Sequence, residues 1–180
     1  IKEGLIYTAF DGSLNQRVLS VRGGIVCKSR NMPLNAPRPR RIADANPATY
    51  LLKNKYVALT RERALSLIKY CDRAGKLFHP NAGSFMAAVM LAGKDGIGLY
   101  FLGEEMLSET AMFLPFMKMS ELTAVVVHED GRVRPFKPSI AAIRRDPKNY
   151  RDAPRMHLFI LGITSEIVDE AVQVLRGELK

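Results

Sequence analysis

The order of apolar and polar residues predicts short strands alternating with helices along the chain. Residues 4–10 are rich in β-branched and aromatic side chains, which favours a first strand closed by a turn at residues 11–13. Residues 17–30 predict a second strand, which Gly23-Gly24 interrupts as a bulge, a kink or a hairpin. Residues 31–47 hold four prolines, which exclude a helix or a central strand. We therefore expect a mobile loop there.

A helix with a single apolar stripe is the clearest local signal in the sequence. Residues 55–59 predict a short strand that leads directly into this helix. Thr60 is suited to capping its start, and Gly75 to ending it. The stripe consists of Ala64, Leu67, Ile68 and Cys71.

The middle of the chain predicts further strands and a second helix. Residues 84–91 and 97–102 read as two strands joined by the hairpin signal Lys94-Asp95-Gly96. Residues 111–117 predict another strand. Ser120 then caps a helix that continues to Val127 or His128 and ends at Gly131.

The last part of the chain predicts a buried strand followed by an amphipathic helix. The strand covers residues 156–163, and the helix covers Ser165–Leu175. The inward positions of the helix are Ile167, Val168, Ala171, Val172 and Leu175. This order of elements predicts an α/β (α+β) fold with a C-terminal strand–helix appendage, and no internal repeat is present.

The composition is that of one folded domain, or of one domain with an appendage. Of the 180 residues, 47% are hydrophobic and 25% are charged, which suffices for a substantial core. No apolar run approaches the roughly 20 residues of a membrane helix, so we expect no membrane partner. Cys27 and Cys71 have no Cys-x-x-Cys spacing, which favours a reducing compartment, with a single disulfide as the alternative.

The charge is both large and unevenly distributed. The net charge is +9, with a sequence pI near 9.8. Residues 17–55 carry nine Lys/Arg and one acid, a net of +8, and residues 131–156 carry eight and two, a net of +6. Residues 77–130 carry two and seven, a net of −5. Such segregation favours a nucleic-acid partner, although solubility, a ribosome or an acidic protein would also account for it.

The candidate RNA-binding side chains lie mainly in the first basic segment. Alternation along the second strand puts Val26, Lys28 and Arg30 on one face, opposite Ile25 and Cys27. We expect that face to hold phosphates, with Tyr7 and Phe10 as possible base-stacking rings or as core residues. The loop arginines are expected to act as a tether. The full set of expected cations is Arg17, Arg22, Lys28, Arg30, Arg38, Arg40, Arg41, Lys53, Lys55 and Lys76.

The sequence shows no arrangement that indicates catalysis. His79, His128 and His157 each lack a second His, Cys or carboxylate at the spacing of metal ligands. The glycine patterns of nucleotide-binding loops and of the nucleophile elbow are missing. Glu104-Glu105 and Glu109 read as a solvated acidic rim. We therefore expect a protein that is not an enzyme and needs no metal and no cofactor.

Element order and a few short stretches resemble the Whirly fold. The stretches are residues 55–59 leading into the Thr60 helix, Phe78-His79-Pro80, a hairpin, residues 112–116, and a helix opened by Ser120-Glu121-Leu122. Roughly residues 4–130 take part. The chain resembles the plant Whirly single-stranded-nucleic-acid proteins and, in function, the kinetoplastid mitochondrial RNA-binding proteins that bind guide RNA. The second strand lacks the Lys-Gly-Lys-Ala-Ala-Leu signature of the plant proteins, which disfavours the plant type.

This resemblance implies a specific fold and function. The fold would be Whirly-like, with two antiparallel four-stranded sheets and helices between them. Residues 1–131 would form the nucleic-acid-binding domain, and residues 132–180 a basic linker with a C-terminal strand and helix packed on the same core. The resemblance also implies a mitochondrial protein that forms a homo- or hetero-oligomer, with a tetramer favoured.

We expect a sequence-tolerant single-stranded RNA-binding protein that promotes annealing of guide RNA to mRNA in mitochondrial RNA editing. RNA held by its backbone would leave the bases free to pair. A structural mitochondrial ribosomal or ribonucleoprotein assembly protein is the first alternative, because it would share the charge pattern. A single-stranded DNA-binding protein or transcription regulator is the second.

Overall fold

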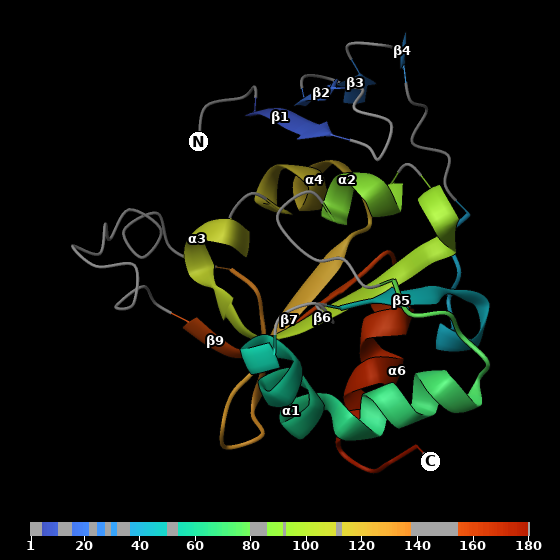
Figure 1. Cartoon of the computed structure of the whole chain (residues 1–180), viewed down its shortest axis with the longest axis vertical. Coiled ribbons are helices and arrows are strands. Elements are labelled where there is room, and N and C mark those ends of the chain that lie inside the picture. The colour runs from blue at the N-terminus through green and yellow to red at the C-terminus, as the bar shows by residue number, and fades with distance from the viewer. Residues whose placement is uncertain are drawn as a thin grey trace.

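The computed structural model shows a mixed α/β fold with two sheets (Figure 1). It describes residues 5–10, 16–21, 25–27, 30–31, 37–49, 54–79, 86–91, 93–110, 113–137 and 155–179. The first sheet is antiparallel, and its strands follow chain order. These strands are β1 (Leu5–Phe10), β2 (Gln16–Val21), β3 (Ile25–Cys27) and β4 (Arg30–Asn31).

The second sheet has five strands in the order β5-β6-β9-β7-β8 and is mixed, because β5 runs parallel to β6. Its strands are β5 (Asn46–Ala48), β6 (Ile97–Met106), β7 (Thr123–Val127), β8 (Val133–Pro135) and β9 (Arg155–Gly162). The C-terminal strand is central, since β9 pairs with both β6 and β7. The expected strand–helix appendage is therefore wrong for the strand, and the boundary expected after residue 131 falls within the β7–β8 hairpin.

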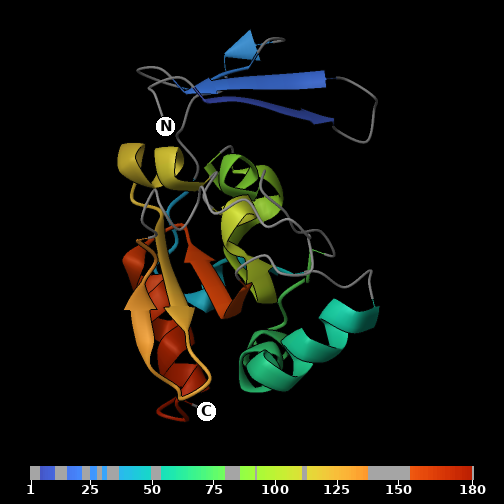
Figure 2. The ribbon, with the colours of Figure 1, turned by 90° about the vertical axis from the view of Figure 1, so that its left-hand side faces the viewer.

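Helices cover both faces of the five-stranded sheet (Figures 1 and 2). One face carries α1 and α6, and α2 and α4 lie over the other. The helices are α1 (Asn54–Arg73), α2 (Met86–Leu91), α3 (Leu107–Thr110), α4 (Leu114–Met119) and α6 (Ser165–Leu175). Among the described residues, no helix is long and apolar enough to cross a membrane.

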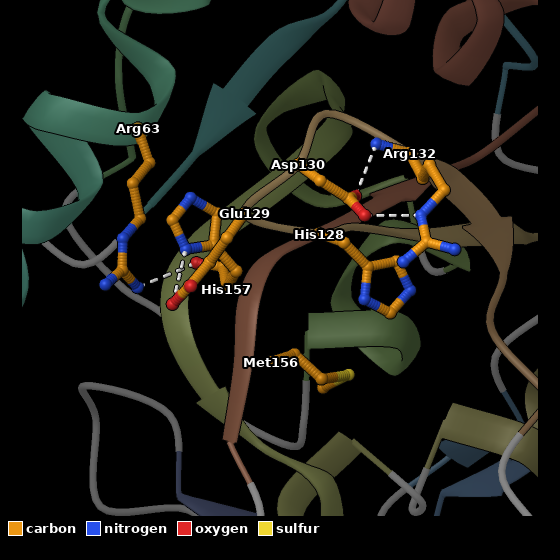
Figure 3. A pocket seen from close by; sticks show the side chains of 7 residues that line it. All are labelled: Arg63, His128, Glu129, Asp130, Arg132, Met156 and His157. Carbon is orange, nitrogen blue, oxygen red and sulfur yellow. Dashed lines mark hydrogen bonds and ion pairs between the residues drawn. The ribbon is translucent and has the colours of Figure 1, made fainter.

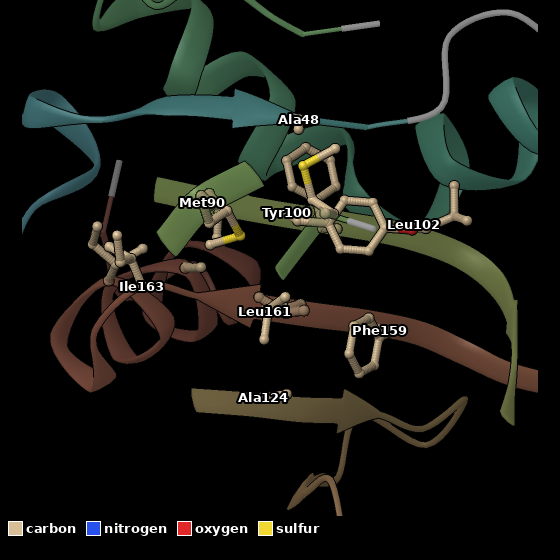
Figure 4. Close-up of a cluster of buried hydrophobic side chains, with 14 of the residues drawn as sticks. Ala48, Met90, Tyr100, Leu102, Ala124, Phe159, Leu161 and Ile163 are labelled. Atoms are coloured by element: carbon tan, nitrogen blue, oxygen red, sulfur yellow. The ribbon is translucent and has the colours of Figure 1, made fainter. Parts of the chain in front are cut away.

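The core is centred on β6 and β9, which are covered on both sides (Figure 4). Phe159 in β9 packs against Phe113 and Phe136, with ring centroids 5.7 and 5.2 Å away. Tyr100 in β6 contacts Phe113 and Phe159, each at 6.1 Å. A strand buried on both faces has no solvent side, which explains why residues 158–161 are continuously apolar rather than alternating.

The elements with a long, clear pattern are confirmed. β1, β6 and β9 lie where strands were expected, and α6 covers Ser165–Leu175 with its predicted face inward. In α1, Ala64, Leu67 and Cys71 are fully buried. Gly75 follows the end of this helix with φ +66°, a conformation that suits glycine. Val21 pairs antiparallel with Ile25, so the hairpin was the correct alternative between β2 and β3.

Several short elements have the opposite type to the one expected. Residues 55–59 belong to α1, and the strands expected at residues 84–91 and 111–117 are replaced by α2 and α4. The helix expected from Ser120 to His128 is replaced by β7. Composition accounts for these differences: Met, Ala and Leu favour α2, whereas the β-branched run Thr-Ala-Val-Val-Val favours a strand.

The expected hairpin turn at Lys94–Gly96 and the expected helix cap at Thr60 have other structural roles. Lys94–Gly96 is a 3₁₀ turn that joins α2 to β6 rather than a hairpin between strands. Thr60 is not a helix cap, because it lies inside α1 and is buried. Its Oγ1 accepts a hydrogen bond of 3.1 Å from the backbone N–H of Gly103, which attaches α1 to β6.

The described part of the proline-rich segment is packed, which corrects the expected mobile loop for residues 37–47. Ile42 in the 3₁₀ turn Ile42–Asp44 is fully buried. The Thr164 hydroxyl donates a 3.0 Å hydrogen bond to the carbonyl oxygen of Pro39. Pro47 is accommodated in β5, because β5 is an edge strand of the sheet.

Candidate nucleic-acid interface

An open groove lies where β7 ends and β9 begins, between α1 and the β7–β8 turn (Figure 3). It consists of two adjoining cavities of about 490 and 550 Å³ that share Arg63, His128, Glu129 and His157. We call it the α1–hairpin groove. Its polar and charged lining residues are Glu62, Arg63, Ser66, Lys69, His128, Glu129, Asp130, Arg132 and His157.

Strand register brings His128 and His157 to this groove. The last pair of the β7–β9 ladder is Val127 with Leu158, so the next opposed positions are His128 and His157. The backbone N–H of His128 donates a 2.9 Å hydrogen bond to the carbonyl oxygen of Arg132, which continues the β7–β8 pairing. Opposed residues of antiparallel strands lie on the same side, with Cβ atoms about 4.5–5.5 Å apart. Two imidazoles therefore share the wall of one groove.

The helix side of the groove is anchored by Arg63. Its Nη1 donates a 2.9 Å hydrogen bond to the carbonyl oxygen of His157, which connects α1 to the start of β9. The next residue, Ala64, departs from helical geometry with φ −126° and ψ 23°, so α1 bends at this contact. The bend and the hydrogen bond fix the Arg63 guanidinium at the groove.

The turn side of the groove positions Arg132. Its backbone N–H and its Nε both donate to the carboxylate of Asp130. The backbone hydrogen bond is the main cause that lowers the pKa of Asp130, and the Arg132 side chain adds to it. Gly131 has φ +78°, which allows the tight turn between these residues. The hairpin thus presents an oriented guanidinium.

Cations from separate parts of the chain gather around this groove. Arg63 and Lys69 line it from α1, and Arg132 lines it from the β7–β8 turn. Gly131 and Met156, the two ends of the basic segment of residues 131–156, also line it. The basic segment of residues 131–156 therefore both begins and ends here. Among the described residues, no group of three or more His, Cys, Asp or Glu side chains is placed to hold a metal ion.

The loop arginines lie at the opposite end of the sheet and contact acids. Arg38 is 2.7 Å from a carboxylate oxygen of Glu121, just before β7 begins. Arg40 is 3.4 Å from Glu166 at the start of α6. Arg41 follows on the same packed segment. The expected tether is therefore a docked segment, whose charges are partly compensated by the protein itself.

The other expected RNA-binding residues are distributed over several places. Tyr7 and Phe10 lie in β1, Arg17 in β2 and Arg30 in β4, whereas Arg22, Lys28 and Lys53 lie outside the described residues. Lys55 is in the first turn of α1, and Lys76 follows the helix end.

The register corrects the shared face that we expected for Val26, Lys28 and Arg30. Arg30 is paired with Cys27 across two antiparallel strands rather than continuing one strand from Val26. Arg30 therefore lies on the face of Cys27, opposite to that of Val26.

The groove residues were missed at the level of sequence. His128 and His157 are far apart in the chain, and only the β7–β9 register makes them neighbours. The run Thr123–Val127 could have indicated a strand ending at His128. No protein-family model matches the chain, and no curated protein sequence matches it. We therefore infer a function from the geometry and charge of this groove.

Proposed function

We propose that this chain is a sequence-tolerant single-stranded RNA-binding protein that holds the phosphate backbone at the α1–hairpin groove. The observation that carries the proposal is that cations from α1 and from the β7–β8 turn, Arg63, Lys69 and Arg132, line one open groove. Neutralising phosphates with such cations releases counterions, which supplies affinity without reading sequence. An open groove admits an extended strand from either end.

The lining favours phosphate contacts over base contacts. The described residues that line the groove include no Phe, Tyr or Trp. Aromatic platforms are the usual way to stack unpaired bases, whereas guanidinium groups hold phosphates in bidentate hydrogen bonds. Bases of the bound strand would therefore remain exposed and able to pair.

Exposed bases on the bound RNA lead to a narrower proposal, the annealing of two RNA strands. A strand held by its backbone is suited to annealing, so pairing of guide RNA with mRNA in mitochondria stays our specific proposal, with an oligomer as the working form. The five-stranded mixed sheet departs from the two antiparallel four-stranded sheets of the Whirly fold. The annealing proposal therefore depends on how RNA is held rather than on a match of folds.

A salt titration of RNA binding tests the proposal. Fluorescence anisotropy would follow a labelled oligouridylate between about 50 and 200 mM KCl. With about five phosphates neutralised, we expect log K to fall against log salt with a slope near −3.5. Similar slopes with other sequences, and competition by RNA more than by DNA, would support sequence-tolerant RNA binding.

Matched variants locate the interface. The double variant Arg63→Gln with Arg132→Gln should make the slope of log K against log salt shallower by about 1.4, because two phosphate contacts are lost. Arg73→Gln is the control, since Arg73 is exposed at the far end of the same helix. Arg132→Gln alone, on an exposed turn, keeps the test valid if the double variant fails to fold. A slope near zero for the parent, or equal effects of Arg73→Gln and the groove variants, would refute the proposal.

A further inference from the structure

We infer that His128 and His157 form a proton-dependent site for an RNA phosphate in the α1–hairpin groove. This inference rests on the proposed function, because it makes the bound RNA backbone the ligand. It adds that protonation of two imidazoles strengthens the affinity of the groove for RNA.

The placement makes the two histidines act on one ligand. They occupy opposed positions just past the last β7–β9 pair, and both line the same cavity (Figure 3). His128 is exposed, and the His157 side chain is 27% exposed. An imidazolium in this cavity can donate a hydrogen bond to an unesterified oxygen of a phosphodiester, which carries one negative charge. Arg63 and Arg132 line the same cavity on either side.

The remaining charges of the groove balance one another. Its described lining contains the cations Arg63, Lys69 and Arg132 and the anions Glu62, Glu129 and Asp130. These six groups give a net charge of zero. Protonation of both histidines changes the net charge of the lining to +2. Protonated imidazoles would therefore give the lining a net positive charge and strengthen its hold on a phosphate.

The charged neighbours come from two of the elements that form the groove. Glu62, Arg63 and Lys69 face it from α1, and Glu129, Asp130 and Arg132 face it from the turn. α6 contributes Leu175, and β9 contributes Met156 and Leu158 besides His157. Glu129 Oε1 lies 3.8 Å from Nδ1 of His157.

Histidine is the side-chain type here that changes charge near neutral pH. Carboxylates, guanidinium groups and lysines ordinarily keep their charges between about pH 5.5 and 8, whereas an imidazole ordinarily titrates within that range. A bound phosphate favours the protonated form, so binding takes up protons. By linkage, RNA affinity must then increase as the pH falls.

The chain offers a matched control for this effect. It contains three histidines, and the third, His79, lies at the opposite end of the sheet beside β5. Nε2 of His79 is 3.2 Å from Asp95 rather than near the groove. Glutamine keeps a polar side chain and removes the titration, so His→Gln changes isolate the charge.

The test is the salt dependence of oligouridylate binding at about pH 5.5 and about pH 8. One additional neutralised phosphate should make the slope of log K against log salt steeper by up to about 0.7 at the lower pH. The double variant His128→Gln with His157→Gln should lose that difference, and His79→Gln should keep it. His128→Gln alone, on an exposed residue, should lose about half of it, and this variant serves if the double variant does not fold.

The outcomes separate this inference from the proposed function. A steep slope that is equal at both pH values would leave RNA binding standing and overturn the histidine site. A pH difference that survives in both the double and the single variant would also overturn it. Absence of RNA binding at both pH values would refute both proposals.

Free inorganic phosphate is the other source of the same ligand chemistry. Imidazole C–H signals followed by NMR at the lower pH would compare it with the oligouridylate. We expect the RNA to shift the His128 and His157 signals at much lower concentration, because it also contacts the surrounding cations. Equal or tighter binding of inorganic phosphate would overturn the assignment to RNA.

Discussion

Glu170 in α6 accepts hydrogen bonds from two other parts of the chain. Its Oε1 accepts a 2.8 Å hydrogen bond from the hydroxyl of Tyr70 in α1, and its Oε2 accepts one of 2.7 Å from the backbone N–H of Ile42. One carboxylate therefore holds the packed segment of residues 37–44 against both helices. The hydrogen bond to Glu170 is the main cause that raises the pKa of Tyr70, and burial adds to it.

Tyr70→Phe should reduce stability in a pH-dependent way. At neutral pH we expect the free energy of unfolding to fall by roughly 1 kcal/mol, because a hydrogen bond to a carboxylate is lost. The folded pKa of Tyr70 lies above its ordinary value of 10.0, so its contribution is complete below that pH and is lost as the pH rises through the folded pKa. Urea unfolding of parent and variant from neutral to strongly alkaline pH should show the difference shrinking. A constant difference would contradict this prediction.

Cys71 should be chemically inert in the folded protein. The thiol is fully buried, and burial raises its pKa to about 12, so almost none of it is thiolate near neutral pH. In a Cys27→Ser background, reaction with a disulfide reagent at mildly alkaline pH should be slow and limited by opening of the fold. Urea should make it fast. Labelling of the folded chain at the rate of a free thiol would show that α1 does not bury this side chain.

At the scale of elements, β9 and α6 approach each other closely at Gly162. A Cβ atom added there would lie 2.6 Å from Cγ2 of Val168 and 2.9 Å from the carbonyl oxygen of Thr164. Both distances are shorter than a van der Waals contact of a Cβ atom. A glycine at residue 162 therefore allows the end of β9 to lie this close to the start of α6. The close approach also lets Ile167 and Val168 reach the central strand.

Gly162→Ala should therefore destabilise the fold by about 1–3 kcal/mol through overpacking. Val168→Ala alone should also destabilise it, because it leaves a cavity in the core. In the double variant the two changes should partly compensate, since the smaller side chain makes room for the new methyl group. The measurement is a double-mutant cycle by urea unfolding. Additive losses would show that the Val168 contact does not limit this position.

Sequence patterns predicted the long elements and failed on the short ones. α6 and the second half of α1 are long enough for an apolar stripe to recur, and β9 is long enough to be recognised as buried. α2, α4 and β7 each have at most six residues, over which a helical and a strand period cannot be told apart. At that length composition is the better guide, since Met, Ala and Leu favour the helix α2 and the β-branched run of β7 favours a strand.

The sequence predicted the local charge at the candidate site but not the contacts between residues that are distant along the chain. Local counting of charge identified the basic segment of residues 131–156, whose two ends lie at the groove. The neighbours His128 and His157 depend on strand register, and Arg63 depends on how α1 packs on β9. Arg38 and Arg40 looked like free cations because Glu121 and Glu166, which contact them, are distant in sequence.

At the scale of the whole molecule, the two ends of the five-stranded sheet differ in charge balance. One end pairs Arg38 and Arg40 with acids of the same chain. The other end balances three cations with three acids around the α1–hairpin groove, where two histidines can add positive charge. The first sheet lies on the α2 and α4 side of the molecule (Figures 1 and 2). It adds Arg17 and Arg30, with Arg22 and Lys28 between them in sequence.

Removing residues 1–36 tests which surface binds RNA. Every strand of the second sheet, together with α1 and α6, lies after this segment. We therefore expect the shortened chain to keep the helical signal of its circular dichroism spectrum and a cooperative thermal unfolding transition. It should also keep the pH-dependent part of RNA binding, because His128, His157, Arg63 and Arg132 are all retained.

The salt dependence of the shortened chain then measures the contribution of the first sheet. The deleted segment includes Arg17, Arg22, Lys28 and Arg30, so four phosphate contacts are lost if all of them bind RNA. We expect the slope of log K against log salt at alkaline pH to become shallower by up to about 2.8. An unchanged slope would remove these four cations from the interface and leave the groove as the binding surface. Loss of the pH-dependent part, in a chain that still folds, would mean that the groove does not bind RNA without the first sheet.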